Sequence, residues 1–241
     1  MSSYINLLPE VIVYPLRRLK YMVFQRDRYL KFNRLREGIS DEGYSLKPFD
    51  DFQCIFIHIP KCAGQSVRNT LFDNLQPGHI NAYSYQYIFP RSIYNRYFKF
   101  TFVRNPWDRL VSAYFFMKSG GAHKKDQNWT DQNLAMYPDF STFVLEGLQL
   151  SRIQAWPHFR PQVDFLRGQN GKIELDFIGR FENLQEDFNH VRDHLGQRGE
   201  LLFINQTKTI REHYQTYYSD ELREIAADVY KEDIEAFDYR F

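Results

Sequence analysis

The segment Gln53-Cys-Ile-Phe-Ile-His-Ile-Pro-Lys-Cys-Ala-Gly-Gln-Ser66 predicts a strand, a tight loop and the start of a helix. Its first part, from Gln53 to His58, is a short apolar run typical of a buried strand. A loop of mostly small residues follows from Pro60 to Gly64. Apolar side chains then recur at helical spacing as far as Asn74, so the order is strand, loop and helix.

The loop and the helix that it opens form a predicted phosphate cradle. Backbone N–H groups at the start of a helix lack partners within the helix, and the helix dipole favours negative charge there. Lys61 adds a full positive charge, and the Ser66 hydroxyl adds a hydrogen-bond donor. We therefore expect the residues from Lys61 to Ser66 to bind a phosphate-like group.

This loop differs from the common nucleotide-triphosphate loop, G-x-x-x-x-G-K-[ST]. In that loop a lysine follows the last glycine, and the next residue supplies a hydroxyl that binds magnesium. Here Lys61 precedes Gly64, and the next predicted strand is followed by Arg104 rather than by a metal-binding aspartate. Lysine and arginine in place of magnesium and aspartate favour a phosphate site that works without a metal.

A second strand-to-helix turn follows the apolar run from Tyr97 to Val103. Asn105-Pro106 supplies an N-cap and a proline at the first helical position. Arg104 lies at the turn, and its planar guanidinium matches a phosphate in a bidentate manner. Ser112 lies about two helical turns further on, so we expect Arg104 and Ser112 to clamp one phosphate. Arg109 is the weaker partner and is expected to face solvent.

Further strands and helices predict the fold class. Asp176–Gly179 is expected to be a strand that leads into a helix from about Glu182 to Leu195, and a last helix is expected from about Ser219 to Ala236. Alternating strands and helices indicate a parallel sheet covered on both faces. We predict an α/β fold, a P-loop-like three-layer sandwich with a central parallel sheet flanked by helices. Ligands of such sheets bind beyond the carboxyl ends of the strands, where both turns lie.

Length and composition exclude several classes of protein. The chain has 241 residues, enough for one sizeable hydrophobic core. Its net charge of +1 argues against a broad nucleic-acid-binding surface. Its two cysteines, Cys54 and Cys62, suggest no disulfide framework, and no apolar run reaches the ~18 residues of a membrane span. We expect a cytoplasmic protein that does not bind nucleic acid.

Residues 1–50 are predicted to form a basic amphipathic extension and a linker, ahead of a domain over residues 51–241. Asp27 is the one acidic residue among eight basic residues between Tyr14 and Arg36, while Leu16, Leu19 and Val23 recur at helical spacing. One interpretation is peripheral contact with an anionic membrane surface or with an anionic polymer. The alternative is a helix whose apolar face packs on the core and whose basic face is solvated.

Two motifs resemble those of a known family. Pro60-Lys-Cys-Ala-Gly-Gln-Ser66 resembles the 5′-phosphosulfate loop of sulfotransferases that use 3′-phosphoadenosine 5′-phosphosulfate, abbreviated PAPS. Val103-Arg-Asn-Pro-Trp-Asp-Arg-Leu-Val-Ser-Ala-Tyr114 resembles their 3′-phosphate motif. Both motifs are similar to the carbohydrate, or type-2, branch. Three further stretches match that branch more loosely: His158–Gln162, Ile178–Leu184 and Tyr217–Phe241.

The resemblance implies transfer of a sulfuryl group from PAPS to a hydroxyl of a carbohydrate or glycoconjugate acceptor, with PAP as the product and no metal. The implied donor site consists of Lys61, Cys62, Ala63, Gly64, Gln65, Ser66, Arg104 and Ser112. By resemblance, the backbone from Cys62 to Ser66 and the Ser66 side chain hold the 5′-phosphosulfate, and Lys61 contacts the oxygen between phosphorus and sulfur. Arg104 and Ser112 hold the 3′-phosphate. Cys62 replaces the family's usual threonine or serine, and a thiol is a weaker donor than a hydroxyl.

Sulfuryl transfer needs a general base that takes the proton of the acceptor hydroxyl. His79 is expected near the Lys61 loop, where the resemblance implies a base and the sequence equally allows a structural polar residue. His158 is the rival candidate, with acceptor binding or a structural role as its alternatives. His58 is expected to be buried and structural. Glu182 is expected to be a helix cap, although a carboxylate base at this position stays open.

Three other segments are expected to complete the site. The segments from Ala82 to Tyr97 and from His123 to Tyr137 mix aromatic and cationic residues, which suit an acidic or sulfated glycan. For the first of them, tyrosines that alternate along a strand between core and rim are the alternative. The segment from Asn205 to Tyr218, with Lys208 and Arg211, is expected to close over the nucleotide.

Two other functions stay open. One is a nucleotide-triphosphate-dependent kinase or NTPase, which the position of Lys61 and the missing metal carboxylate disfavour. The other is a catalytically silent glycan- or nucleotide-binding protein on the same scaffold. The presence of Lys61, Arg104 and Ser112 together argues against the silent protein.

Overall fold

A small parallel sheet lies at the centre of the molecule. The structure is a computed structural model that describes residues 10–76, 78–202 and 212–241. Within these residues, the strands β1 (Cys54–Ile57), β2 (Phe98–Val103) and β3 (Phe177–Arg180) pair in the order β1-β2-β3, all parallel. The predicted central parallel sheet flanked by helices is therefore confirmed.

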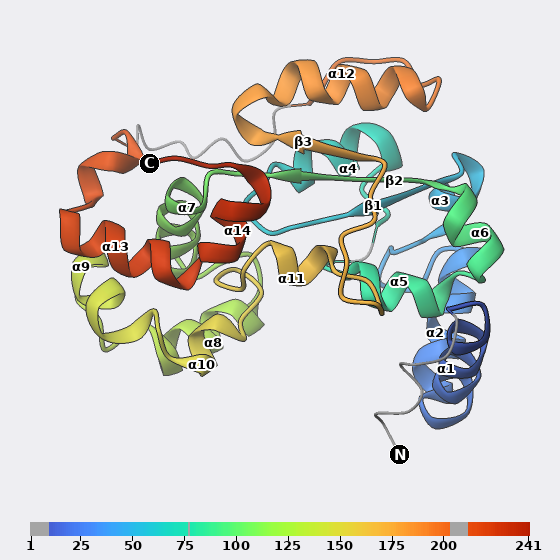
Figure 1. Cartoon of the computed structure of the whole chain (residues 1–241), viewed down its shortest axis with the longest axis horizontal. Coiled ribbons are helices and arrows are strands. Elements are labelled where there is room, and N and C mark those ends of the chain that lie inside the picture. Colours follow the sequence, from blue (N-terminus) through green and yellow to red (C-terminus); the bar gives the residue numbers. More distant parts are fainter. Residues whose placement is uncertain (1–9, 77, 203–211) are drawn as a thin grey trace.

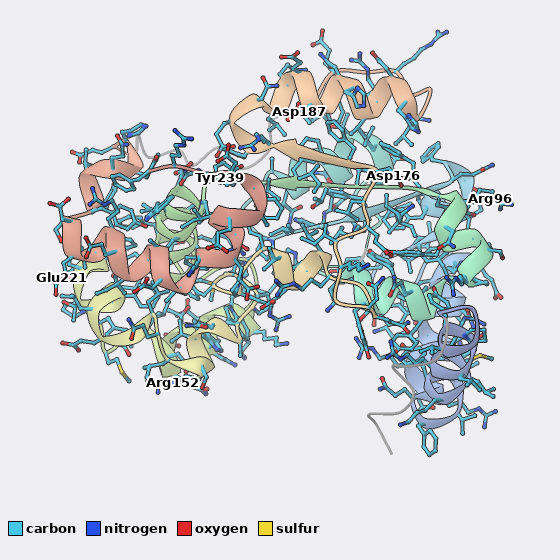
Figure 2. The ribbon with its side chains drawn as sticks, in the orientation of Figure 1. Arg96, Arg152, Asp176, Asp187, Glu221 and Tyr239 are labelled. Carbon is cyan, nitrogen blue, oxygen red and sulfur yellow. The ribbon has the colours of Figure 1, made fainter. Side chains whose placement is uncertain are left out.

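The sheet is held together by aromatic side chains and by two carboxylates. Phe56 on β1 and Phe100 on β2 occupy paired positions, and their rings stack with centroids 5.0 Å apart. β3 is fixed at both ends: Asp176 accepts a hydrogen bond of 2.7 Å from the Lys99 backbone N–H, and Asp187 accepts one of 2.6 Å from that of Arg180. Figure 2 labels both carboxylates, on either side of β3.

A helix follows each strand. α4 (Gly64–Phe72) follows β1, α7 (Pro106–Lys118) follows β2, and α12 (Leu184–His194) follows β3 after a 3₁₀ turn over Phe181–Asn183. In Figure 1, α12 lies above the sheet, α5 (Ala82–Ile88) and α11 (Val163–Leu166) lie below it, and α7 lies beyond the ends of the strands. The carboxyl ends of β1 and β2 thus open between α4 and α7.

Shorter helices complete the described chain. They are α3 (Lys47–Asp51), α6 (Arg91–Arg96), α8 (Lys124–Asn133), α9 (Phe140–Thr142), the π-helical turn Phe143–Gly147, α10 (Ser151–Gln154), the 3₁₀ turn Tyr214–Tyr217, α13 (Asp220–Val229) and α14 (Lys231–Phe237). The last helix expected from the sequence is interrupted at Tyr230, which lies between α13 and α14 and is fully buried. Its hydroxyl donates a hydrogen bond to the Phe159 carbonyl, so burial of this ring accompanies the break.

Two segments differ from their predicted structure. The strand considered for residues 82–97 is wrong, since α5 and α6 cover most of this segment. Tyr85, Tyr94 and Tyr97 belong to the core, so most of these rings stabilise the fold. Part of the expected linker is also buried, because Leu46 and Phe49 pack in the same core.

The N-terminal helices pack on the rest of the molecule through an unexpected face. α1 (Glu10–Phe24) and α2 (Arg26–Glu37) lie against α5, and the Tyr21 and Tyr87 rings stack at 4.7 Å. The predicted packing of the apolar stripe on the core is wrong, because Leu19 and Val23 are exposed. In the part of the chain described, no helix combines the length and the apolar character needed to cross a membrane.

Candidate active site

The first strand-to-helix turn, which joins β1 to α4, has a strained backbone and ends at a position where only glycine fits. Lys61 and Ala63 both have positive φ angles, 69° and 60°, in the left-handed region that non-glycine residues rarely adopt. Gly64 begins α4 directly against the His58 ring, because a Cβ at residue 64 would lie 1.8 Å from His58 Cδ2. The loop is therefore tightly built around the first N–H groups of α4.

The buried Arg109 side chain ties this loop to another part of the chain by hydrogen bonds. Its guanidinium donates hydrogen bonds to three carbonyl oxygens, at 3.0 Å to Pro60, 2.9 Å to Arg160 and 3.3 Å to Pro157. The expectation that Arg109 faces solvent is wrong, since only 1% of the residue is exposed. A planar group with five donors satisfies several carbonyls at once, which accounts for an arginine at this buried position.

The Lys61 side chain reaches an aromatic ring on α7, the helix that follows β2. Its Nζ atom lies 4.0 Å from the centroid of the Phe116 ring, a cation–π contact. Phe116 also stacks on His158, with centroids 5.1 Å apart. Sequence reasoning missed Phe116, although a signal was present: Asp108, Ser112 and Phe116 follow one another at i+4 spacing on one face of α7.

Arg104, in the second strand-to-helix turn between β2 and α7, contacts the first turn. The Arg104 Nη1 donates a hydrogen bond of 3.1 Å to the Lys61 carbonyl, and Nε lies 2.7 Å from a carboxylate oxygen of Asp108. The guanidinium also covers the Phe181 ring at 3.9 Å. Ser112 lies two turns further along α7 and is half-buried. The Arg104 guanidinium thus lies against the backbone of the first turn.

Gln162 joins the two turns to each other. Its Oε1 accepts hydrogen bonds from the Arg104 backbone N–H at 2.9 Å and from the Cys62 thiol at 3.2 Å, and its Nε2 donates to the Arg104 carbonyl at 2.9 Å. The buried carboxylate of Asp233 accepts from the Gln162 and Val163 backbone N–H groups at 2.8 and 2.9 Å. Sequence reasoning quoted Gln162 within a loosely matching motif but assigned it no role.

Cys62 is a packed thiol. It is 1% exposed, and burial raises the pKa of its thiol to about 12. The thiol is therefore protonated at neutral pH and donates to Gln162. Its side chain therefore serves the structure of the loop.

Three histidines lie together behind the first turn. The His79 ring centroid is 4.4 Å from that of His58 and 5.9 Å from that of His158. His79 Nδ1 lies 3.1 Å from the His58 carbonyl oxygen. A carbonyl only accepts, so Nδ1 carries the proton and Nε2 is the unprotonated nitrogen of neutral His79. Desolvation by burial, opposed by this hydrogen bond, lowers the pKa of His79 to about 4.

His58 and His158 are buried more deeply than His79. Desolvation and the neighbouring His79 hold the pKa of each well below the ordinary histidine value. Among the described residues, the Nδ1 atoms of both rings are buried without a hydrogen-bond partner. His158 is linked to Lys61 through the Phe116 ring, on which it stacks.

The Glu182 carboxylate forms hydrogen bonds that stabilise the second turn. One carboxylate oxygen accepts a hydrogen bond of 2.6 Å from the Asn105 backbone N–H, and the other accepts one of 3.0 Å from the Tyr239 hydroxyl. Figure 2 labels Tyr239 near the C-terminal end of the chain. Glu182 therefore binds the backbone at the turn before α7 and is not the expected cap of its own helix, where no side-chain cap is formed.

Comparisons with known proteins agree with this geometry. The model of the Sulfotransferase family matches residues 46–240. The chain belongs to the sulfotransferase family. The resemblance to its carbohydrate branch is confirmed by carbohydrate sulfotransferase 11 of Mus musculus, which is 29% identical over 168 residues, or 59% of this chain and 47% of that protein. The same protein of Rattus norvegicus matches to the same extent.

Other comparisons add less. An uncharacterized protein of Archaeoglobus fulgidus is 33% identical over 111 residues, which make up 46% of this chain and 78% of that protein. No solved structure matches the chain. The matched part of this sulfotransferase spans about half the length of the mouse and rat proteins.

A further aromatic pair lies beside the core at α8. The Trp129 and Trp156 rings stack with centroids 4.7 Å apart, and Lys125 Nζ lies 5.7 Å from the centroid of Trp156. Trp156 precedes His158 by two residues, so this pair adjoins the histidine cluster in the chain. Lys208 and Arg211, expected to close over the nucleotide, lie outside the described residues.

Proposed function

We propose that this sulfotransferase moves a sulfuryl group from PAPS to a hydroxyl of a carbohydrate or glycoconjugate. The observation that carries the proposal is the contact between the two turns, in which Arg104 donates to the Lys61 carbonyl over 3.1 Å. Arg104 thereby touches the backbone of Lys61, and both cationic residues follow the ends of neighbouring strands, which suits a donor with phosphate groups at two positions. A P-loop-like arrangement of the sandwich is part of this proposal.

The residues present fit such a donor. Lys61 and the first N–H groups of α4 bind the 5′-phosphosulfate, together with the Ser66 side chain. Arg104 and Ser112 bind the 3′-phosphate. Arg104 already contacts Asp108, so a phosphate shares the guanidinium with this carboxylate, which five donors allow. PAPS supplies a sulfuryl group whose bond to the phosphate oxygen breaks as the acceptor oxygen bonds to sulfur.

His79 is proposed as the general base. The His58 carbonyl holds the proton on Nδ1, so Nε2 takes the proton of the acceptor hydroxyl. A pKa of about 4 keeps His79 neutral before reaction, and a bound anion raises that pKa by stabilising the imidazolium. Lys61 stabilises the negative charge that develops on the leaving oxygen. His158 is proposed to position His79 rather than to take the proton.

The acceptor is proposed to bind beside α8. Stacked tryptophans offer an aromatic surface for a sugar ring, and Lys124 and Lys125 are exposed cations that suit an acidic or sulfated glycan. The names of the mouse and rat relatives support a carbohydrate acceptor. We propose no metal in the reaction, because Lys61 and Arg104 provide the charge that a metal otherwise supplies.

Calorimetric titration with PAP in EDTA, with ATP–Mg²⁺ as the comparison, tests the donor class. We expect micromolar or tighter PAP binding without metal and little binding of ATP. Transfer from labelled PAPS to acidic glycans then tests turnover. Tighter binding of ATP–Mg²⁺ would support a kinase or NTPase, and PAP binding without transfer to any glycan would support the silent scaffold.

Two histidine variants test the base. His79→Asn should lower kcat by roughly 10²–10⁴-fold with PAP binding retained, because it removes the proton acceptor. His158→Asn, at the residue proposed to position His79, should lower kcat by much less than His79→Asn does. If the two variants lost kcat equally, or if only His158→Asn lost it, His79 would not be the base.

A further inference from the structure

α1 presents an apolar stripe to solvent. Leu16, Leu19, Val23 and Phe24 are 48%, 56%, 62% and 77% exposed. Leu16, Leu19 and Val23 recur at spacings of three and four residues, which places them on one side of the helix, and Phe24 follows Val23 at the end of the helix. Four large apolar side chains that lie close together along one helix and remain exposed mark an interaction surface. We name these four residues the α1 stripe.

The opposite face of α1 explains why the stripe points outward. Tyr14 and Tyr21 are buried there. Arg17 and Arg18 also turn toward the protein, since their guanidinium groups donate to the carbonyls of Gln169 at 2.9 Å and Tyr87 at 3.2 Å. Aromatic rings and bonded arginines therefore occupy the face that packs on the domain. The α1 stripe is left without a partner in the part of the chain that the structure describes.

Basic residues accompany the α1 stripe. Lys20 lies one helical turn from both Leu16 and Phe24, and it is exposed. α2 begins directly after the stripe with Arg26 and Arg28, which are also exposed, as is Lys31 one turn later. Apolar side chains that enter the headgroup region, with cations that meet acidic lipids, are what a helix lying on a membrane requires.

We propose that the α1 stripe and the neighbouring cations of α1 and α2 bind the surface of an anionic lipid bilayer. The helix lies in the plane of the interface and does not cross it. In Figure 1, α1 and α2 lie at the lower right, and α7 and α13 lie at the opposite end of the long axis. Binding through α1 therefore leaves the α7 side of the active site uncovered. The proposal is independent of the donor and acceptor proposed above.

Flotation with lipid vesicles tests the proposal. The intact protein is mixed with phosphatidylcholine vesicles, with or without phosphatidylserine. We expect binding to the anionic vesicles, weaker binding in high salt because the charges are screened, and little binding to phosphatidylcholine alone. The double variant Leu19→Asp/Val23→Asp should weaken vesicle binding by more than about tenfold. Lys20→Ser/Arg26→Ser should weaken it about fivefold for each charge removed.

A matched control separates this surface from a general effect of charge. Met136→Asp replaces an apolar side chain that is 60% exposed and belongs to neither α1 nor α2. This variant should bind vesicles like the wild type, and the urea midpoint of unfolding should be unchanged in all variants, which shows that they fold. Equal loss by Met136→Asp would overturn the proposal.

Three further results would also overturn the proposal. One is failure of the wild type to float with anionic vesicles. Another is a wild-type dimer that Leu19→Asp/Val23→Asp converts to a monomer, since a second copy of the chain would then cover the stripe. The last is a protein whose variants all fail to bind vesicles but which binds a soluble polyanion such as polyphosphate. In that case Leu19→Asp/Val23→Asp would still bind the polyanion.

Discussion

The two strand-to-helix turns occupy equivalent places, at the carboxyl ends of β1 and β2, and are built in opposite ways. The first turn has left-handed residues at Lys61 and Ala63, and it depends on contacts with distant parts of the chain. The second is regular: Asn105 caps α7 by accepting from the Trp107 backbone N–H at 3.1 Å, and Pro106 occupies the first helical position. The first turn thus has an irregular backbone, whereas the second begins its helix in a regular way, although Gln162 and Glu182 bind its backbone from elsewhere in the chain.

This difference suggests a division of labour. The first turn offers backbone N–H groups and Lys61, which a strained loop can place close to the atoms that change charge. The second offers a side-chain clamp on a stable helix, which suits binding of a group that does not react. Lys61 should therefore act mainly in the transition state, and Arg104 mainly in the ground state.

Lys61→Ala should produce the largest effect. Because Lys61 stabilises charge that develops only during transfer, we expect kcat to fall about 10²–10³-fold while PAP binding changes little. Steady-state kinetics with labelled PAPS and calorimetry with PAP measure the two quantities. Lys47→Ala, at an exposed lysine paired with Asp51, is the matched control and should be silent. A variant that lost PAP binding as strongly as kcat would remove the distinction between the turns.

Arg104→Ala should instead weaken PAP binding, by about 10- to 150-fold, because a charge-assisted contact worth roughly 1.5–3 kcal/mol is lost. Its kcat at saturating donor should change less. Asp108→Asn sharpens the test, since the Asp108 carboxylate competes with phosphate for the same guanidinium. We expect this variant to bind PAP about threefold more tightly. Weaker binding by Asp108→Asn would show that the carboxylate orients Arg104 instead.

Gln162→Ala breaks the link between the two turns. The substitution leaves the Arg104 backbone N–H and carbonyl and the Cys62 thiol without their shared partner. We expect the free energy of unfolding to fall by about 2 kcal/mol, as judged by urea denaturation, with weaker PAP binding. Gln154→Ala, which removes one amide contact to the Leu148 carbonyl outside the site, should cost less. Equal costs would mean that the turns do not depend on Gln162.

The sequence predicts the parts of this site that depend on neighbouring residues. The Lys61 loop, the Asn105 cap and the parallel sheet follow from local patterns, because loop composition, capping and apolar spacing act over a few positions. The bonds of Arg109, Gln162 and Asp233 join residues distant in the chain, and no local pattern in the sequence encodes them.

The same limit explains the error at α1. Helical spacing identifies the stripe that includes Leu19 and Val23, but spacing does not tell which face of a helix meets the protein. That choice depends on partners such as Tyr87, which stacks on Tyr21 and accepts from Arg18. For α5 and α6, aromatic residues with high strand preference lie in helices because their rings fill the core.

Mildly acidic pH should also distinguish the two turns, through the histidines beside the first. Burial lowers the pKa of His58, His79 and His158, that of His79 to about 4, so the folded protein holds all three neutral. Below the ordinary histidine pKa of 6.5, the unfolded chain binds more protons. The stability gained from the neutral rings is present above pH 6.5 and falls toward pH 4, by about 1.4 kcal/mol per pH unit for each histidine.

His158→Asn should therefore flatten the decline of the free energy of unfolding between pH 6.5 and 5, while His213→Asn, at an exposed position, should not. The three rings adjoin the first turn, where His58 lies against Gly64, whereas His158 meets α7 at Phe116, near the end of that helix. Hydrogen exchange at mildly acidic pH should accordingly open the start of α4 before the start of α7, since local opening there relieves the buried imidazoles. Equal protection of both helix starts would mean that the histidines support the whole domain rather than the strained turn.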